Sequence, residues 1–155
     1  MKKILVSECL YGGRAVRYDG ADIRETDPRF LRWKAEGRLL PVCPEVFGGL
    51  TTPRPAAQRV GDRVRTESGK DVTREYAAGA AEALRLAREH AVAFAILKQG
   101  SPSCGSKYIH DGTFSGLKKK GQGLTAEYLR NAGFTVLGEE DLDEAARLLA
   151  DGDGD

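Results

Sequence analysis

The chain has 155 residues, of which 41% are hydrophobic and 30% charged, a balance that fits one globular domain and excludes a disordered or fibrous protein. Its 24 basic and 23 acidic side chains give a net charge of +1, which offers no reason to expect binding to duplex nucleic acid or to a membrane surface. No apolar run approaches the roughly 20 residues of a membrane helix, and the N-terminal apolar run is too short for a secretory signal. We therefore expect a cytoplasmic protein.

The N-terminal third predicts a strand followed by a helix. Residues 3–7 are apolar and β-branched, as in a short buried strand, and they run directly into Cys9. Asp27 followed by Pro28 is typical of a helix N-terminus, and Gly37 is expected to end that helix.

The middle of the chain predicts a second strand, a long loop and a long helix. Residues 39–43 form a short apolar run that Pro44 ends. Residues 48–57 are rich in Gly, Thr and Pro, which indicates a loop. Residues 59–66 alternate around Gly61-Asp62, which fits either a hairpin or an irregular excursion of the chain. Residues 71–90 carry an apolar stripe at helical spacing, which we interpret as ordinary core packing.

The C-terminal part repeats the alternation of strand and helix. Residues 92–97 predict a third strand, and Asp111-Gly112 predicts a turn between two short extended segments. A helix over 125–131, a strand over 134–137 and a helix over 142–149 complete the pattern.

This alternation predicts the fold class: α/β, a Rossmann-like three-layer sandwich with a mostly parallel sheet. We expect a single domain over residues 1–150 and a disordered tail over residues 151–155. In such folds, ligands bind beyond the carboxyl ends of the strands.

Three cysteines are predicted to meet at that edge of the sheet. Cys9 follows the first strand, Cys43 closes the second, and Cys104 lies in the loop after the third. An odd number of cysteines in a reducing compartment does not suggest a disulfide framework, so metal-binding or catalytic roles gain weight.

Several kinds of site remain open for three converging thiols. Zinc on three cysteines, with His110 as a fourth ligand, is one. A 4Fe–4S cluster with one open iron is another. Three unrelated buried thiols are a third interpretation, since cysteine is often simply buried. A redox couple is less favoured, because the sequence has no C-x-x-C pair.

Polar residues flank the cysteines in the predicted loops. Glu45, two residues after Cys43, is a candidate general acid or base. Ser101 and other loop side chains are candidates for contacting a substrate, although they could equally brace their own loops. The candidate substrate contacts are Ser7, Arg17, Asp19, Arg54 and Ser103.

A run of three lysines, residues 118–120, is the one concentrated basic segment. It could contact a phosphate, but charge runs are usually exposed to solvent, and we favour a solvated turn here.

Six motifs occur in order along the chain: V-S-x-C-L, V-R-Y-D-G, P-V-C-P-E-V-x-G-G-L-x-T-P-R-P, A-I-L-K, S-P-S-C-G and D-G-T-F-S-G. Together they resemble the family once catalogued as domain of unknown function 523, which includes the thiouracil desulfidases. The resemblance spans roughly residues 3–139. One departure is Gln99-Gly100, where a charged residue and a bulkier one are expected.

The resemblance implies a 4Fe–4S cluster on Cys9, Cys43 and Cys104, whose fourth iron binds the sulfur of a thiolated pyrimidine before water replaces it with oxygen. It also implies that Glu45 and Ser101 are the catalytic pair. The expected substrate is a small thiolated base, nucleoside or nucleotide; a base within tRNA is an alternative that the near-zero net charge does not favour. Two rival functions stay open: an iron–sulfur hydro-lyase and a zinc-stabilised binding module.

Overall fold

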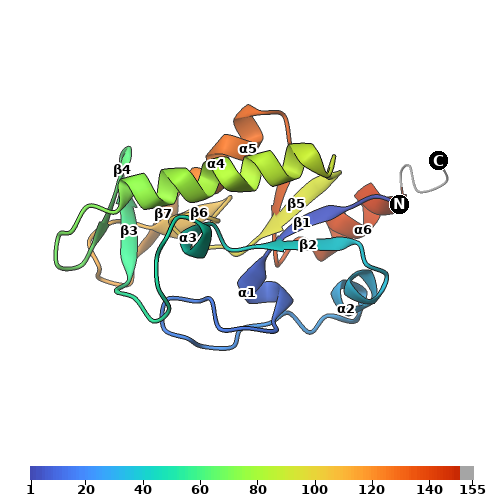
Figure 1. Ribbon diagram of the computed structural model, residues 1–155, viewed down its shortest axis with the longest axis horizontal. Coiled ribbons are helices and arrows are strands. Elements are labelled where there is room, and N and C mark those ends of the chain that lie inside the picture. The colour runs from blue at the N-terminus through green and yellow to red at the C-terminus, as the bar shows by residue number, and fades with distance from the viewer. Residues whose placement is uncertain (151–155) are drawn as a thin grey trace.

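The computed structural model describes residues 1–150, and the predicted tail at residues 151–155 lies outside the described residues. A central sheet of four parallel strands organises the chain (Figure 1). From one edge to the other, its strands are β2 (Leu39–Val42), β1 (Ile4–Ser7), β5 (Phe94–Leu97) and β8 (Val136–Gly138). All three neighbouring pairs are parallel, which confirms the predicted sheet.

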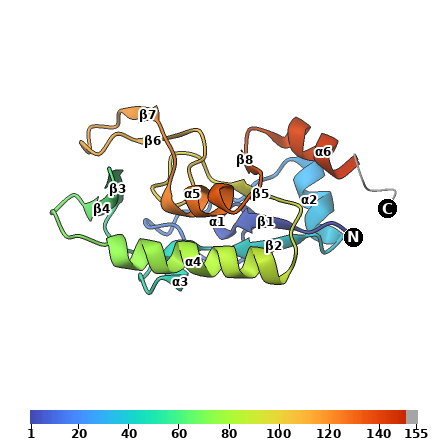
Figure 2. The ribbon, with the colours of Figure 1, turned by 90° about the horizontal axis from the view of Figure 1, so that it is seen from above.

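Helices cover both faces of this sheet, and its strands are therefore buried on both sides. On one face, α4 (Thr73–Glu89) and α5 (Leu124–Asn131) pack against a core that includes Leu5. On the other face, α2 (Pro28–Ala35) and α6 (Leu142–Ala150) pack against a core that includes Ile4 and Val6. Figure 2 shows α4 and α6 on opposite sides of the strands. The α/β sandwich expected from the sequence is confirmed.

Two small hairpins extend the fold beyond the central sheet. The predicted hairpin consists of β3 (Ala57–Val60) and β4 (Arg63–Thr66), and it packs on the first turns of α4 through a third core. A second hairpin consists of β6 (Tyr108–His110) and β7 (Lys118–Lys120). Residues 118–120 are therefore an exposed strand and not the solvated turn that we favoured.

Two helices of a single turn were absent from our predictions. They are α1 (Glu8–Tyr11), directly after β1, and α3 (Pro44–Phe47), directly after β2. One turn is too short to show a hydrophobic period, although proline at the first position of α3 is a known start signal. Both short helices lie at the carboxyl ends of their strands, where the cysteines are.

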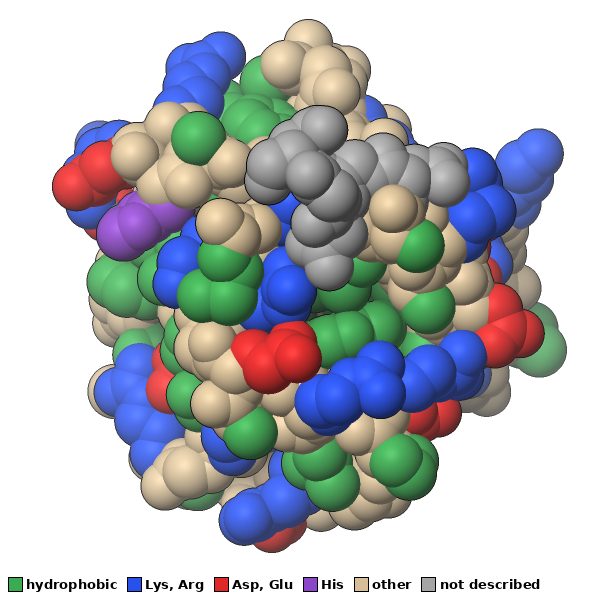
Figure 3. All heavy atoms as spheres, turned by 90° about the vertical axis from the view of Figure 1, so that its right-hand side faces the viewer, with side chains coloured by type: hydrophobic (Ala, Val, Ile, Leu, Met, Phe, Trp, Pro, Cys, Tyr) green, Lys and Arg blue, Asp and Glu red, His purple; other side chains and the backbone are tan. Residues whose placement is uncertain are grey.

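The surface mixes charges of both signs. On the face drawn in Figure 3, basic and acidic side chains lie among apolar ones. Within residues 1–150, no helix is both long enough and apolar enough to cross a membrane.

Candidate functional site

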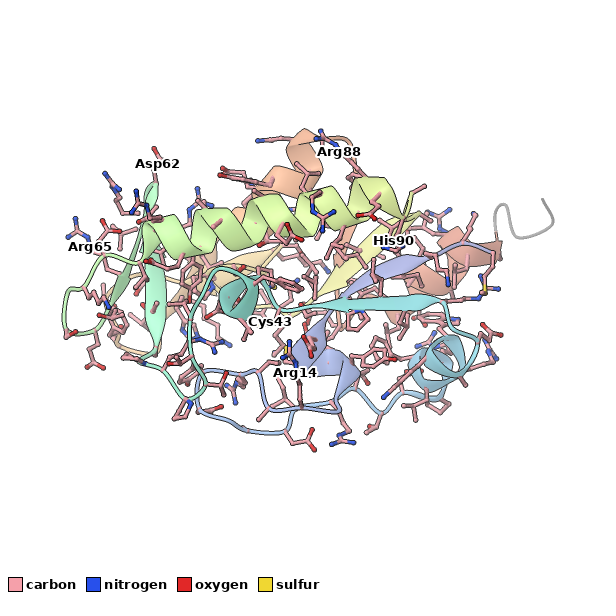
Figure 4. The ribbon with its side chains drawn as sticks, in the orientation of Figure 1. Arg14, Cys43, Asp62, Arg65, Arg88 and His90 are labelled. Carbon is pink, nitrogen blue, oxygen red and sulfur yellow. The ribbon has the colours of Figure 1, made fainter. Side chains whose placement is uncertain are left out.

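The three cysteines line one cavity of about 350 Å³ at the carboxyl ends of β1, β2 and β5. Cys9 lies within α1, Cys43 is the residue before the first turn of α3, and Cys104 is in the loop after β5. Figure 4 shows Cys43 where β2 meets α3. The predicted convergence of the three thiols is confirmed.

Ser101 shapes the loop that carries Cys104. Its Oγ accepts hydrogen bonds from the backbone N–H groups of Ser103 (3.1 Å) and Cys104 (3.0 Å). A serine oxygen in this position satisfies two backbone donors that a turn would otherwise leave unpaired. Ser101 also lines the cavity, so it both orients Cys104 and faces the space in which a substrate would lie.

Gln99 holds the other end of the same loop. Its side-chain oxygen accepts from the backbone N–H groups of Ser106 (3.1 Å) and Lys107 (2.9 Å), and its own backbone N–H donates to Glu139 (2.8 Å). Glu139 in turn pairs with Lys98 at 2.7 Å. An amide with one acceptor and two donors suits this position, which explains why the uncharged Gln99 is compatible with the site.

Glu45 enters the cavity from the first turn of α3 with its two oxygens in different surroundings. Its Oε1 accepts a hydrogen bond from the hydroxyl of Tyr76 (2.6 Å) and one from Nε of Arg54 (3.2 Å). Its Oε2 accepts no hydrogen bond from the residues that the structure describes. Burial, together with the charge of Glu45, raises the pKa of Tyr76 far above its ordinary value, so the tyrosine stays a donor.

Burial dominates the electrostatics of the three thiols. It raises the pKa of Cys9 to about 12, with a further rise from Cys43 and an opposing effect from Lys98. Burial also raises the pKa of Cys43 and of Cys104. Three thiolates in this cavity therefore require a positive centre to hold them.

The donor set fits an iron–sulfur cluster in its chemistry. All three cysteines are free, and sulfur is the ligand that such clusters use. Within residues 1–150, no three His, Cys, Asp or Glu side chains gather closely enough to hold a single metal ion. The cysteines surround a shared space, as ligands to different irons of one cluster would.

The structure brings most of the predicted contact residues to this cavity. Ser7, Arg17 and Arg54 line it. The hydroxyl oxygen of Ser7 accepts a hydrogen bond from the backbone N–H of Lys98 (2.9 Å). Arg17 is partly exposed and pairs with Asp19 at 3.1 Å.

Two predicted contacts do not lie at the cavity. Ser103 is fully buried, and its hydroxyl is hydrogen-bonded to Thr125 at 2.8 Å, because the turn directs it toward α5. The carboxylate of Asp19 accepts a hydrogen bond from the backbone N–H of Ala21 and pairs with Arg17, which does line the cavity. Neither residue is among those that line the cavity.

Sequence reasoning missed several residues that line the cavity: Tyr76, Lys98, Tyr108 and Phe114. Tyr76 belongs to the apolar stripe of α4, and nothing in the stripe distinguishes it from a packing residue. His110 was weighed only as a zinc ligand; its Nδ1 is buried and has no partner among the described residues. Residues of the second hairpin and its turn, including Tyr108 and Phe114, contribute to the cavity lining, although the hairpin is not part of the central sheet.

Comparisons with known proteins agree with this arrangement. The chain is 42% identical over 151 residues to the uncharacterized protein YbbK of Bacillus subtilis (strain 168), covering 91% of this chain and 98% of that one. It superposes with a TM-score of 0.94 on the structure of TudS, a [4Fe-4S]-dependent thiouracil desulfidase, at 48% identity over 97% of this chain and 99% of that one. Residues 4–141 match the family model described as 2-thiouracil desulfurase. The chain belongs to the 2-thiouracil desulfurase family.

Proposed function

We propose that this protein is a 4Fe–4S-dependent desulfidase that removes the sulfur of a thiolated pyrimidine by hydrolysis. One observation carries the proposal: three cysteines from three strand ends surround a cavity that also receives Glu45. Membership of the family and 48% identity to a thiouracil desulfidase support it.

The proposed reaction needs water and no oxidant or reductant. The carbon–sulfur bond of the thiocarbonyl breaks, a carbon–oxygen bond to water forms, and the sulfur leaves as hydrosulfide together with one proton. The carbon keeps its oxidation state, so neither a nicotinamide nor a flavin is required.

Cys9, Cys43 and Cys104 would hold the cluster. When bound, a cluster with three protein ligands supplies an iron without a protein ligand, which acts as a Lewis acid toward the thiocarbonyl sulfur. The side chains of this protein would then accept the proton of the attacking water and orient the substrate.

Glu45 and Ser101 are the proposed catalytic pair. Oε2 of Glu45, the oxygen without a described partner, takes the proton of the attacking water as a general base. The oxygen of Ser101 accepts from two backbone groups, so its own O–H proton is the part of the hydroxyl that remains to orient the substrate.

The proposed substrate is a small molecule. A cavity of about 350 Å³ lies within the range of roughly 300–1,000 Å³ that small ligands occupy. Arg17, at the cavity and partly exposed, is the proposed contact for the substrate's oxygen atoms. A free base, a nucleoside and a nucleotide are all compatible with these features, and the cytoplasmic location stays a prediction.

Anaerobic purification followed by an activity assay tests the proposal. We expect iron and acid-labile sulfide in the protein, and with 2-thiouracil a loss of thione absorbance matched by release of sulfide. Parallel assays with thiouridine, its nucleotide and a thiolated tRNA rank the substrates. A protein that contains zinc instead, or a fully loaded cluster that releases no sulfide from any of the four, contradicts the proposal.

A further inference from the structure

The carboxylate of Glu45 is held on one side only, and this asymmetry leads to an inference about two residues outside the catalytic pair. Both side-chain hydrogen bonds that Glu45 accepts from the described residues, those from Tyr76 and Arg54, converge on Oε1. A carboxylate held at one oxygen presents the other in a fixed direction, as a general base must be presented to its water.

Arg54 is built into the wall of the site. Its side chain is only 5% exposed. Besides its Nε bond to Glu45, its Nη1 donates to the backbone oxygen of Thr51 (3.0 Å) and to the hydroxyl of Thr52 (3.0 Å), and its Nη2 donates to the backbone oxygen of Val16 (2.8 Å). All three guanidinium nitrogens thus donate hydrogen bonds to protein atoms, which does not suit a residue whose role is to bind the substrate.

Tyr76 reaches Glu45 because α3 and α4 approach each other unusually closely. A Cβ on Gly79 would lie 1.8 Å from the carbonyl oxygen of Pro44, and one on Gly48 would lie 1.9 Å from the carbonyl oxygen of Glu75. Two glycines, one on each side of the contact, therefore let the backbones touch. Tyr76, one turn before Gly79 on α4, is 2% exposed and meets Glu45 across this contact.

We propose that Tyr76 and Arg54 are positioning residues that fix Oε1 of Glu45 and so leave Oε2 as the single proton-accepting oxygen of the site. The inference rests on the proposed function, because it assigns roles in the desulfidase reaction. Under this inference, Arg54 positions the general base Glu45 and does not bind the substrate, and α4 contributes to catalysis through Tyr76.

The test compares Tyr76→Phe with Tyr128→Phe in the cluster-loaded protein, using 2-thiouracil. Tyr128 is the matched control. It is a partly buried tyrosine on α5 that packs against the third core, to which Tyr76 also belongs, and it does not line the cavity. For Tyr76→Phe we expect kcat to fall about 10- to 100-fold, as for a misplaced catalytic group. KM, iron content and the thermal midpoint are expected to stay close to wild type, and Tyr128→Phe is expected to leave kcat unchanged.

A double-mutant cycle separates positioning from a general structural effect. In single-turnover sulfide release, Tyr76→Phe is expected to have no further effect once Glu45 is replaced by Gln, because both changes act through one carboxylate. A full additional loss in that background overturns the inference, as does a kcat for Tyr76→Phe within about twofold of wild type.

Arg54→Lys changes the second donor to Oε1 of Glu45, and it tests the inference if Tyr76→Phe does not fold. It keeps the charge but loses the planar fork, so the same fall in kcat is expected. A rise in KM with unchanged kcat would instead assign Arg54 to substrate binding and overturn its positioning role. Wild-type protein that releases no sulfide from 2-thiouracil would refute the proposed function itself, an outcome distinct from all of these.

Discussion

Gly79 lies against the carbonyl oxygen of Pro44 so closely that a methyl group at its Cβ position would come within 1.8 Å of that oxygen. Glycine in the middle of a helix costs about 0.5–1 kcal/mol relative to alanine. Its presence at this point of α4 is explained by the neighbouring α3, which carries Glu45 on its first turn. The packing of one short helix on one long helix thus sets the position of a candidate catalytic carboxylate.

Gly79→Ala is predicted to destabilise the protein by about 1–3 kcal/mol, as overpacking does, despite the better helix propensity of alanine. It is also expected to lower activity, because α3 must move away from α4. Urea denaturation and the desulfidase assay measure the two effects. The control is Ala81→Gly at an exposed position of the same helix, which should cost only about 1 kcal/mol and leave activity unchanged. A stabilised, active Gly79→Ala protein would contradict the role assigned to this contact.

Cys104→Ser is predicted to reduce the iron and acid-labile sulfide content strongly, since one of the three proposed sulfur ligands is removed. Metal analysis and visible absorption after anaerobic purification measure the change, and circular dichroism checks the fold. Ser106→Ala, a buried hydroxyl in the same loop that does not line the cavity, is the control for local disturbance. Unchanged cluster content in Cys104→Ser would remove Cys104 from the ligand set.

Ser101→Ala is predicted to affect both stability and activity. It leaves the backbone N–H groups of Ser103 and Cys104 without their acceptor, at a cost of about 1–3 kcal/mol. It also removes the proposed substrate donor, so kcat should fall well beyond what the loss of stability explains. Denaturation curves and kinetics with 2-thiouracil separate the two contributions.

Ser103→Ala, in contrast to Ser101→Ala, is predicted to leave the catalysed reaction unchanged. Its hydroxyl pairs with Thr125 away from the cavity, so the variant is expected to lose about 1 kcal/mol of stability and to keep its KM. A large rise in KM would restore Ser103 to the substrate contacts that the sequence suggested.

Asp27 provides a pH-dependent contribution to stability. Its side chain caps α2 by accepting from the backbone N–H of Arg29, and the hydrogen bond from the Arg29 side chain lowers the pKa of the carboxyl group. The stabilisation is therefore present above the ordinary aspartate pKa of about 3.9 and is lost as the pH falls through the lower folded-state value. Asp27→Asn keeps a capping oxygen but loses the charge. We expect it to be less stable than wild type at pH 7, and we expect the difference in stability to shrink as the pH falls below the ordinary aspartate pKa, as measured by denaturant titrations. A difference that does not change with pH would contradict this account.

The elements that carry a long periodic pattern were predictable. The stripe over residues 71–90 predicted α4, and Asp27-Pro28 predicted the start of α2 with the capping contact that is observed. The one-turn helices α1 and α3 were not predictable, because four residues show no period. The lysines at 118–120 were misassigned to a turn because strand pairing with β6, and not their own propensity, makes them a strand.

The sequence by itself determined the parallel α/β fold and the meeting of Cys9, Cys43 and Cys104, since parallel strands bring their carboxyl ends to one edge. It also carried the motifs of the family. Only the tertiary structure decided what each polar side chain does there. Ser103 and Asp19 lie off the cavity, Arg54 is enclosed by protein oxygens, and Tyr76 holds Glu45. These roles depend on side-chain directions and on backbone contacts between segments far apart in the chain, which local pattern does not encode.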